Sequence, residues 1–93
     1  MNLKEARKEI RHIDEKMAEL FEKRMELVTE VAKYKKQNGL DIEDPEQERR
    51  ILDECSALIE NDEIRPYYVQ FLQAAMDISK KWQHRLLEGP DNK

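Results

Sequence analysis

The chain has 93 residues, of which 39% are hydrophobic and 41% are charged, with only 2 Gly and 3 Pro. This composition suits amphipathic helices in one small domain and argues against a turn-rich β fold. The net charge of -4 gives no support for a nucleic-acid partner or for binding to an anionic membrane surface.

The first predicted helix runs from about Leu3 to Asn38 and ends at Gly39, a residue type common just after helix C-termini. Its apolar positions recur in steps of three and four, the heptad pattern of a helix that packs along another helix. One charged residue, Arg24, interrupts them. We call this set the heptad seam, and it consists of Leu3, Ala6, Ile10, Ile13, Met17, Leu20, Arg24, Leu27, Val31 and Tyr34.

The length of this helix predicts a second copy of the chain. At 1.5 Å per residue the helix spans roughly 50 Å. A compact domain of this size is only about 30 Å across, with a radius of gyration near 12 Å. Half of the heptad seam would therefore face water in a monomer. A second chain packed along the seam is the simplest way to bury these apolar side chains. A plain coiled-coil dimerisation module remains equally open on this pattern alone.

The second predicted helix begins with Asp44 as its N-cap, Pro45 at the first position and Gln47 completing an approximate capping box. Asn61 and Asp62 break the helical pattern after it. Its predicted apolar face consists of Ile51, Leu52, Cys55, Leu58 and Ile59.

The third predicted helix begins near Pro66 and stops at Gly89-Pro90. Residues 1–90 are therefore predicted to form a single domain, and residues 91–93 a disordered tail. The side chains predicted to face inward on this helix are Tyr68, Phe71, Leu72, Ala75, Ile78, Trp82 and Leu86.

Two cations on the first helix indicate an anionic ligand. Arg24 stays charged in any environment, so its place on an apolar seam calls for a compensating anion. Lys35 follows eleven residues later, which is about three turns along the helix and only about 20° around it. The two side chains could converge on a dianion between them. A salt-bridged Arg24 and a solvated Lys35 are the simpler interpretations of each residue alone.

Polar residues on the other two helices are further candidates for contacts with a ligand. Ser79 and Gln83 form an i, i+4 pair beside the apolar stripe of the third helix, so both are expected to point inward. Glu46 and Glu48 lie in the first turn of the second helix, where acidic residues also stabilise the helix dipole. Each of these signals is weak singly.

Taken in order, these segments resemble the AroQ-type chorismate mutase family over essentially the whole chain. The resemblance implies an all-α fold of three helices with one very long first helix, assembled as an intertwined antiparallel homodimer. The segments that carry it are Leu3–Ile13, Asp14-Glu15-Lys16, Glu22–Leu27, Glu30-Val31, Lys33-Tyr34-Lys35, Asp44–Glu48 and Ser79–Gln83.

The resemblance also implies roles at the substrate site. Arg24 and Lys35 would bind the substrate carboxylates, and Lys35 and Gln83 would reach the ether oxygen. Ser79 would assist carboxylate binding. Glu48, together with the backbone amide of Asp44, would hold the substrate hydroxyl.

The resemblance assigns one further cation, Arg7, to the site of the other subunit. Geometry supports this assignment, because Arg7 is about 25 Å from Arg24 along the helix and roughly a quarter-turn or more around it. Arg7 cannot reach the same small ligand from its own chain. In an antiparallel dimer, the Arg7 of one chain could lie at the substrate site of the other.

Gln47 departs from the family pattern, which has an arginine one residue before the glutamate equivalent to Glu48. Gln47 is kept here as a substrate-binding candidate with one positive charge fewer than the family. Arg49 and Arg50 are expected to turn away from it as surface charge.

The implied activity is the unimolecular [3,3] rearrangement of chorismate to prephenate in aromatic amino-acid biosynthesis. It needs no nucleophile, metal or cofactor, and the sequence offers none: His12 and His84 lack partners at metal-ligand spacing. The alternatives are an isochorismate-pyruvate lyase and a non-catalytic mutase-like binding or dimerisation domain.

No nucleic-acid or membrane partner is expected beside chorismate and a second chain. Met1 to Ile13 lacks the pattern of a signal peptide, and no stretch approaches transmembrane length. The lone Cys55 cannot form an internal disulfide. A cytoplasmic location is therefore expected.

Overall fold

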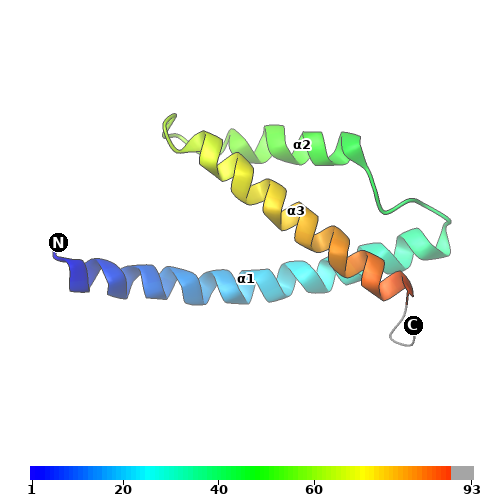
Figure 1. The fold of residues 1–93 in the computed structure, drawn as a ribbon, viewed down its shortest axis with the longest axis horizontal. Coiled ribbons are helices and arrows are strands. Elements are labelled where there is room, and N and C mark those ends of the chain that lie inside the picture. The colour runs from blue at the N-terminus through cyan, green and yellow to red at the C-terminus, as the bar shows by residue number, and fades with distance from the viewer. Residues whose placement is uncertain (89–93) are drawn as a thin grey trace.

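The computed structural model describes residues 1–88, and over that range every regular element is a helix. The helices are α1 (Leu3–Gln37), α2 (Pro45–Ser56) and α3 (Arg65–Glu88), as Figure 1 shows. The prediction of an all-α chain with one very long first helix is confirmed. The predicted stop at Gly89-Pro90 and the tail 91–93 lie outside the described residues.

The ends of α1 are determined by local hydrogen bonds. The Asn2 side chain accepts a hydrogen bond from the backbone N–H of Glu5 at 2.8 Å. At the other end Gly39 has a φ of +63°, in the left-handed region that favours glycine. The N–H of Leu40 then donates to the carbonyl of Lys35 at 2.8 Å, which is the bond of a Schellman motif. The predicted role of Gly39 is confirmed.

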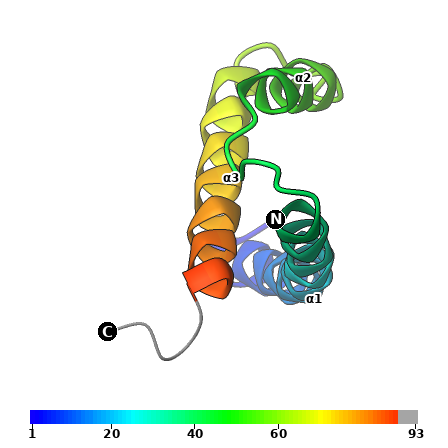
Figure 2. The same ribbon diagram turned by 90° about the vertical axis from the view of Figure 1, so that its right-hand side faces the viewer.

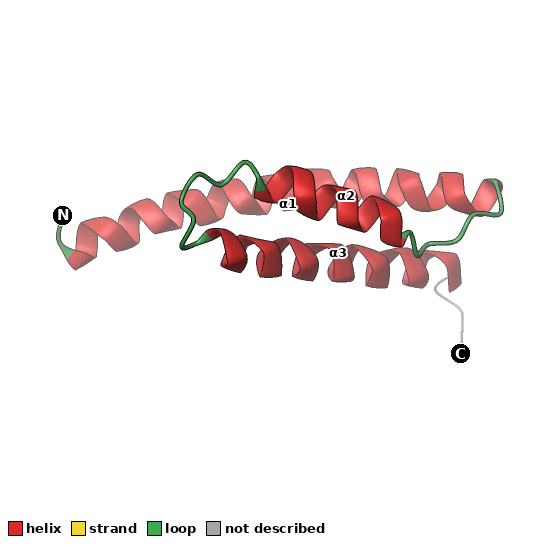
Figure 3. Ribbon diagram, turned by 90° about the horizontal axis from the view of Figure 1, so that it is seen from above, coloured by secondary structure: helices red, strands yellow, loops and turns green. Residues whose placement is uncertain are grey.

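The molecule is elongated because α1 is longer than the rest of the chain. Its extents are 52 × 29 × 20 Å, and its radius of gyration is 16.6 Å, well above the value of about 12 Å for a compact chain of this length. The N-terminal part of α1 projects past the other two helices (Figures 1 and 3). α3 packs against both α1 and α2, and Figure 2 shows it upright beside them, with α2 near its upper end and α1 near its lower end.

The heptad seam is uncovered in a single chain. Its large apolar side chains are between 43% exposed at Met17 and 67% exposed at Leu27. A neighbouring stripe of α1 is less exposed: Ala32 is buried, and Met25, Val28 and Thr29 are half-buried. The indole N–H of Trp82 on α3 donates to the hydroxyl of Thr29 at 2.8 Å. Over residues 1–88 most of the heptad seam is therefore uncovered, whereas the neighbouring stripe is partly buried within the chain.

The predicted extent of α2 was wrong at its C-terminal end. α2 ends at Ser56, and the N–H groups of Leu58 and Ile59 make tighter i to i−3 bonds to Cys55 and Ser56. Leu58 is 74% exposed rather than inward. The carbonyl of Ile59 accepts hydrogen bonds from the Arg65 guanidinium, which turns the chain toward α3.

The predicted inward face of α3 was wrong in part, because in one chain Phe71 and Ile78 are 58% and 45% exposed. The buried side chains of α3 are Met76, Ser79 and Gln83. The difference arises because α3 crosses between two helices instead of lying along one. The buried apolar residues among those described are few: Ala32, Ile42 and Met76. The most buried part of the chain therefore surrounds the polar residues Ser79 and Gln83.

Candidate active site

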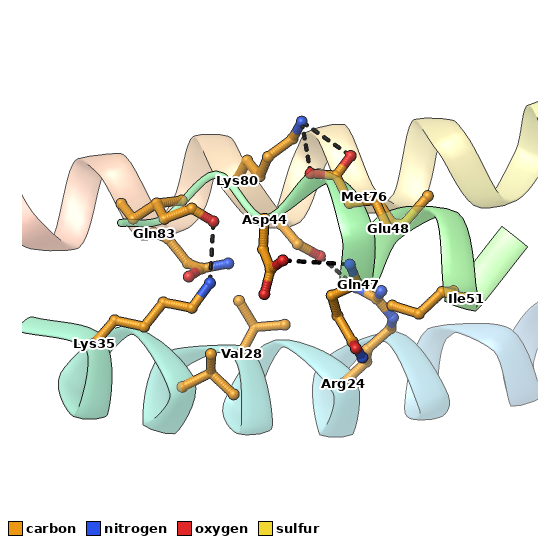
Figure 4. Close-up of a pocket in the computed structure, with 13 residues that line it drawn as sticks. Arg24, Val28, Lys35, Asp44, Gln47, Glu48, Ile51, Met76, Lys80 and Gln83 are labelled. Carbon is orange, nitrogen blue, oxygen red and sulfur yellow. Dashed lines mark hydrogen bonds and ion pairs between the residues drawn. The ribbon is translucent and has the colours of Figure 1, made fainter. Parts of the chain in front are cut away.

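A pocket of about 210 Å³ lies between the C-terminal half of α1, the connection before α2, α2 itself and α3 (Figure 4). Its apolar walls include Val28, Ile42 and Met76. Seven of the eight candidate site residues line this one pocket, although they come from all three helices. They are Arg24, Lys35, Asp44, Gln47, Glu48, Ser79 and Gln83.

Arg24 and Lys35 project from α1 and have neutral partners. Arg24 donates a hydrogen bond to the hydroxyl of Ser79, and Lys35 donates to the carbonyl of Ile42 at 3.0 Å. Neither is within ion-pair distance of a carboxylate in residues 1–88. A partly buried cation is stabilised by an anion in contact with it. The pocket can therefore accept negative charge from a ligand.

Ser79 and Gln83 form the α3 wall, as predicted from their spacing. Ser79 is 5% exposed, and its hydroxyl donates to the carbonyl of Ala75 at 2.9 Å while accepting from Arg24. Gln83 is 7% exposed, and within the described chain its Oε1 atom has no hydrogen-bond partner. A buried polar atom without a partner is costly. The Gln83 carboxamide is thus available to a ligand.

The start of α2 places Asp44 and Gln47 beside each other. The carboxylate of Asp44 accepts from the N–H of Gln47 at 3.3 Å, so the predicted N-cap is confirmed. The expected separation of Arg50 from Gln47 was wrong, because Arg50 Nη1 donates to Gln47 Oε1 at 2.8 Å. Residues three apart on a helix are neighbours on its surface. The Gln47 side chain thus accepts a hydrogen bond from Arg50. In residues 1–88 it makes no capping-box bond with the backbone N–H of Asp44.

Glu48 forms an ion pair with Lys80, which lines the pocket and was not among the predicted site residues. The Nζ atom of Lys80 lies 3.2 Å from Oε2 of Glu48 and 3.5 Å from Oε1 of Glu43. The hydrogen bond to Glu48 is the main reason that the pKa of Lys80 is raised, with added effects from the charges of Glu48 and Glu43. Lys80 is therefore positively charged at neutral pH.

The sequence did contain a signal for Lys80. Met76, Ser79, Lys80 and Gln83 are spaced i, i+3, i+4 and i+7, the pattern of a single helix face. A lysine in that stripe is unusual unless a partner faces it, but the partner, Glu48, is 32 residues away in the chain. Only the packing of α2 on α3 brings the two together.

Arg7 does not line this pocket and lies exposed near the N-terminal end of α1. The structure of one chain therefore leaves Arg7 far from the other seven candidates, at the end of α1 that projects past α3 (Figure 3).

Residues 1–88 show neither a metal-binding cluster nor a membrane-spanning helix. No group of three or more His, Cys, Asp and Glu side chains there is arranged to hold a metal ion. No helix in that range is long and apolar enough to cross a membrane.

Comparison with known proteins agrees with this arrangement of residues. The chorismate mutase of Methanocaldococcus jannaschii is 34% identical over 92 residues, which cover 98% of this chain and 93% of that protein. The T-protein of Haemophilus influenzae is 48% identical over 50 residues, which cover 54% of this chain and 13% of that protein. No solved structure matches significantly. The family model for chorismate mutase type II matches residues 6–84, a span that contains all eight candidate residues. With that match and a relative of nearly equal length, the chain belongs to the type II chorismate mutases, an isomerase family.

Proposed function

We propose that the pocket of this chain binds chorismate and converts it to prephenate by a [3,3] rearrangement, a step in aromatic amino-acid biosynthesis. The observation that carries the proposal is the pair of cations, Arg24 and Lys35, that face the pocket with no carboxylate partner in residues 1–88. A substrate with two carboxylates supplies the two missing anions. The pocket volume of about 210 Å³ lies below the usual range of larger ligand sites, which suits a single-ring molecule.

The rearrangement requires the enzyme only to position the substrate and to stabilise the charge that develops during the reaction. The rearrangement moves electrons within one molecule, so it requires no nucleophile and no proton transfer. The enzyme must hold a flexible dianion in the compact conformation in which the reacting carbons meet. It must also stabilise the negative charge that develops on the ether oxygen as the bond to it breaks.

The donors for that oxygen are Lys35 and Gln83. Both lie on helices, so their positions are held before the substrate arrives. Gln83 has a buried carboxamide whose Oε1 has no hydrogen-bond partner in residues 1–88, and a rotation of the amide presents its NH₂ group to the same space. Lys35 adds a positive charge where the oxygen becomes negative. We assign the catalytic role to Lys35 and Gln83 together with Arg24.

The remaining contacts orient the substrate. Arg24 binds one carboxylate with help from the Ser79 hydroxyl to which it is already bonded. Glu48 accepts a hydrogen bond from the substrate hydroxyl, beside the backbone amide of Asp44. Gln47 contributes a neutral carboxamide at the same end of α2. The site therefore carries one positive charge fewer than it would with an arginine at position 47, and the reaction is the same.

We also propose that two chains form the active enzyme as an intertwined antiparallel homodimer. The uncovered heptad seam supports this, since Leu20, Leu27 and Tyr34 are each more than 60% exposed in one chain. An antiparallel partner would bring its Arg7 to the pocket as a third cation on the substrate. The free Cys55 is in keeping with a cytoplasmic setting.

The test is to incubate the purified protein with chorismate and follow the loss of its ultraviolet absorbance, with identification of the product. Prephenate is the expected product. In a parallel incubation with isochorismate, salicylate and pyruvate without any prephenate from chorismate would identify an isochorismate-pyruvate lyase. No turnover with retained binding would identify a binding domain. Either of these outcomes would refute the proposal.

A further inference from the structure

One cation of the pocket is not used by any of the proposed substrate contacts. Lys80 lines the pocket from α3, and its side chain is 23% exposed. Its Nζ atom forms ion pairs with Glu48 of α2, with Glu43 of the preceding connection and with Asp77 of its own helix. Glu43 and Asp77 are each about half exposed, whereas the Glu48 side chain is 22% exposed and lines the pocket. Figure 4 shows Lys80 and Glu48 on the side of the pocket opposite Arg24.

The charge balance of the pocket depends on this lysine. The lining residues all lie within residues 1–88. Three of them, Arg24, Lys35 and Lys80, are positive, and two, Asp44 and Glu48, are negative. Without Lys80 the two signs would be equal around a ligand that itself carries two negative charges. α2 contributes Gln47, Glu48 and Ile51 to this lining, and none of the three is a cation.

Glu48 is the residue most affected. Its ion-pair partner within residues 1–88 is Lys80. A carboxylate with no partner would repel a dianion placed beside it, and this repulsion is stronger in a partly buried pocket than in water. Glu48 would also lose the contact that holds its side chain in place.

We propose that Lys80 is a positioning residue for the mutase reaction, holding the Glu48 carboxylate at the pocket wall and offsetting its charge so that a dianionic substrate binds next to it. This inference rests on the proposed function. Lys80 itself need not contact the substrate. Its effect is on binding, so it acts on KM more than on kcat.

The test compares Lys80→Met with Lys81→Met. Both variants remove one positive charge from neighbouring positions, but Lys81 is exposed and does not line the pocket. Lys80→Met should raise KM roughly ten-fold with kcat changed less than about three-fold, the scale of one charge lost near a ligand. Lys81→Met should change neither by more than about two-fold, and Lys80→Arg should restore most of the affinity. An unchanged KM in Lys80→Met, or an equal rise in both Met variants, would overturn the inference.

A second comparison tests whether Lys80 acts through Glu48. In a Glu48→Gln background there is no carboxylate charge to offset, so adding Lys80→Met should raise KM much less than it does alone. Equal rises in the two backgrounds would show that Lys80 does not act through Glu48. Circular dichroism checks the fold of each variant, and Lys80→Gln replaces Lys80→Met if the latter does not fold.

Calorimetric titration with prephenate separates this inference from the proposed function. The dissociation constant should rise in Lys80→Met in the same proportion as KM. Absence of turnover by the wild-type protein would count against the proposed function, whereas unchanged prephenate affinity in Lys80→Met would count against the role of Lys80.

Discussion

Replacing Leu20 with alanine should weaken the proposed homodimer strongly. Leu20 is 62% exposed in a single chain and lies near the middle of the heptad seam. Full burial of a leucine side chain stabilises by about 1.5–3 kcal/mol. Burial of the fraction still exposed is therefore worth about 1–2 kcal/mol per chain, or about 2–4 kcal/mol per dimer. The dimer dissociation constant should rise about 30- to 700-fold.

Sedimentation velocity over a series of protein concentrations measures this change. Leu58→Ala is the matched control, because Leu58 is 74% exposed but lies in the connection between α2 and α3, off the seam. It should leave the dissociation constant unchanged. Specific activity of Leu20→Ala should fall on dilution together with the dimer fraction, since Arg7 has no route to the pocket within one chain. A stable monomer with full activity would refute both the assembly and the role of Arg7.

Three further substitutions test the pocket. Arg24→Ala should lower kcat/KM at least about 100-fold, since Arg24 would make charge-assisted bonds to the substrate, with unchanged helix content by circular dichroism; near-normal activity would place the site elsewhere. Gln83→Glu should be active only at acid pH, because a carboxyl must be protonated to donate a hydrogen bond. Its activity should fall as the pH rises through the pKa of the new carboxyl, whereas a flat pH profile of kcat would show that position 83 donates nothing. Gln47→Arg should lower KM about 5- to 30-fold, the equivalent of about 1–2 kcal/mol, and should slightly lower the melting temperature because it removes the hydrogen bond to Arg50 and places two cations three residues apart; unchanged kinetics would mean that the site does not use a cation there.

The helix boundaries that could be predicted are those fixed by neighbouring residues in the chain. Asp44 caps α2 through the N–H three residues later, and Gly39 ends α1 through its own backbone conformation. Such interactions form within one helical turn, so the residue types alone indicate them. The end of α2 was missed because the chain leaves the α-helix there through i to i−3 bonds, and the Ile59 carbonyl bonds to Arg65, a residue that no helix-capping pattern singles out.

Seven candidate residues line one pocket, and their grouping could be predicted because the order of short segments resembles one family. Six of them lie on helices, whose period sets the face that each side chain shares. The pattern also showed that α1 has a face that one chain of this length cannot cover. The amino-acid sequence by itself thus determined the three helices apart from the C-terminal end of α2, the family, and the placement of Arg24 and Lys35 on one face of α1.

The crossing of α3 between α1 and α2 was decided only by the tertiary structure. That crossing selects Met76, Ser79 and Gln83 as the buried face of α3 and leaves Phe71 and Ile78 exposed in one chain. It also places Lys80 against Glu48, a contact between residues 32 positions apart. The physical reason is that helical periodicity specifies which side chains share a face, whereas the angle at which helices pack specifies what that face meets.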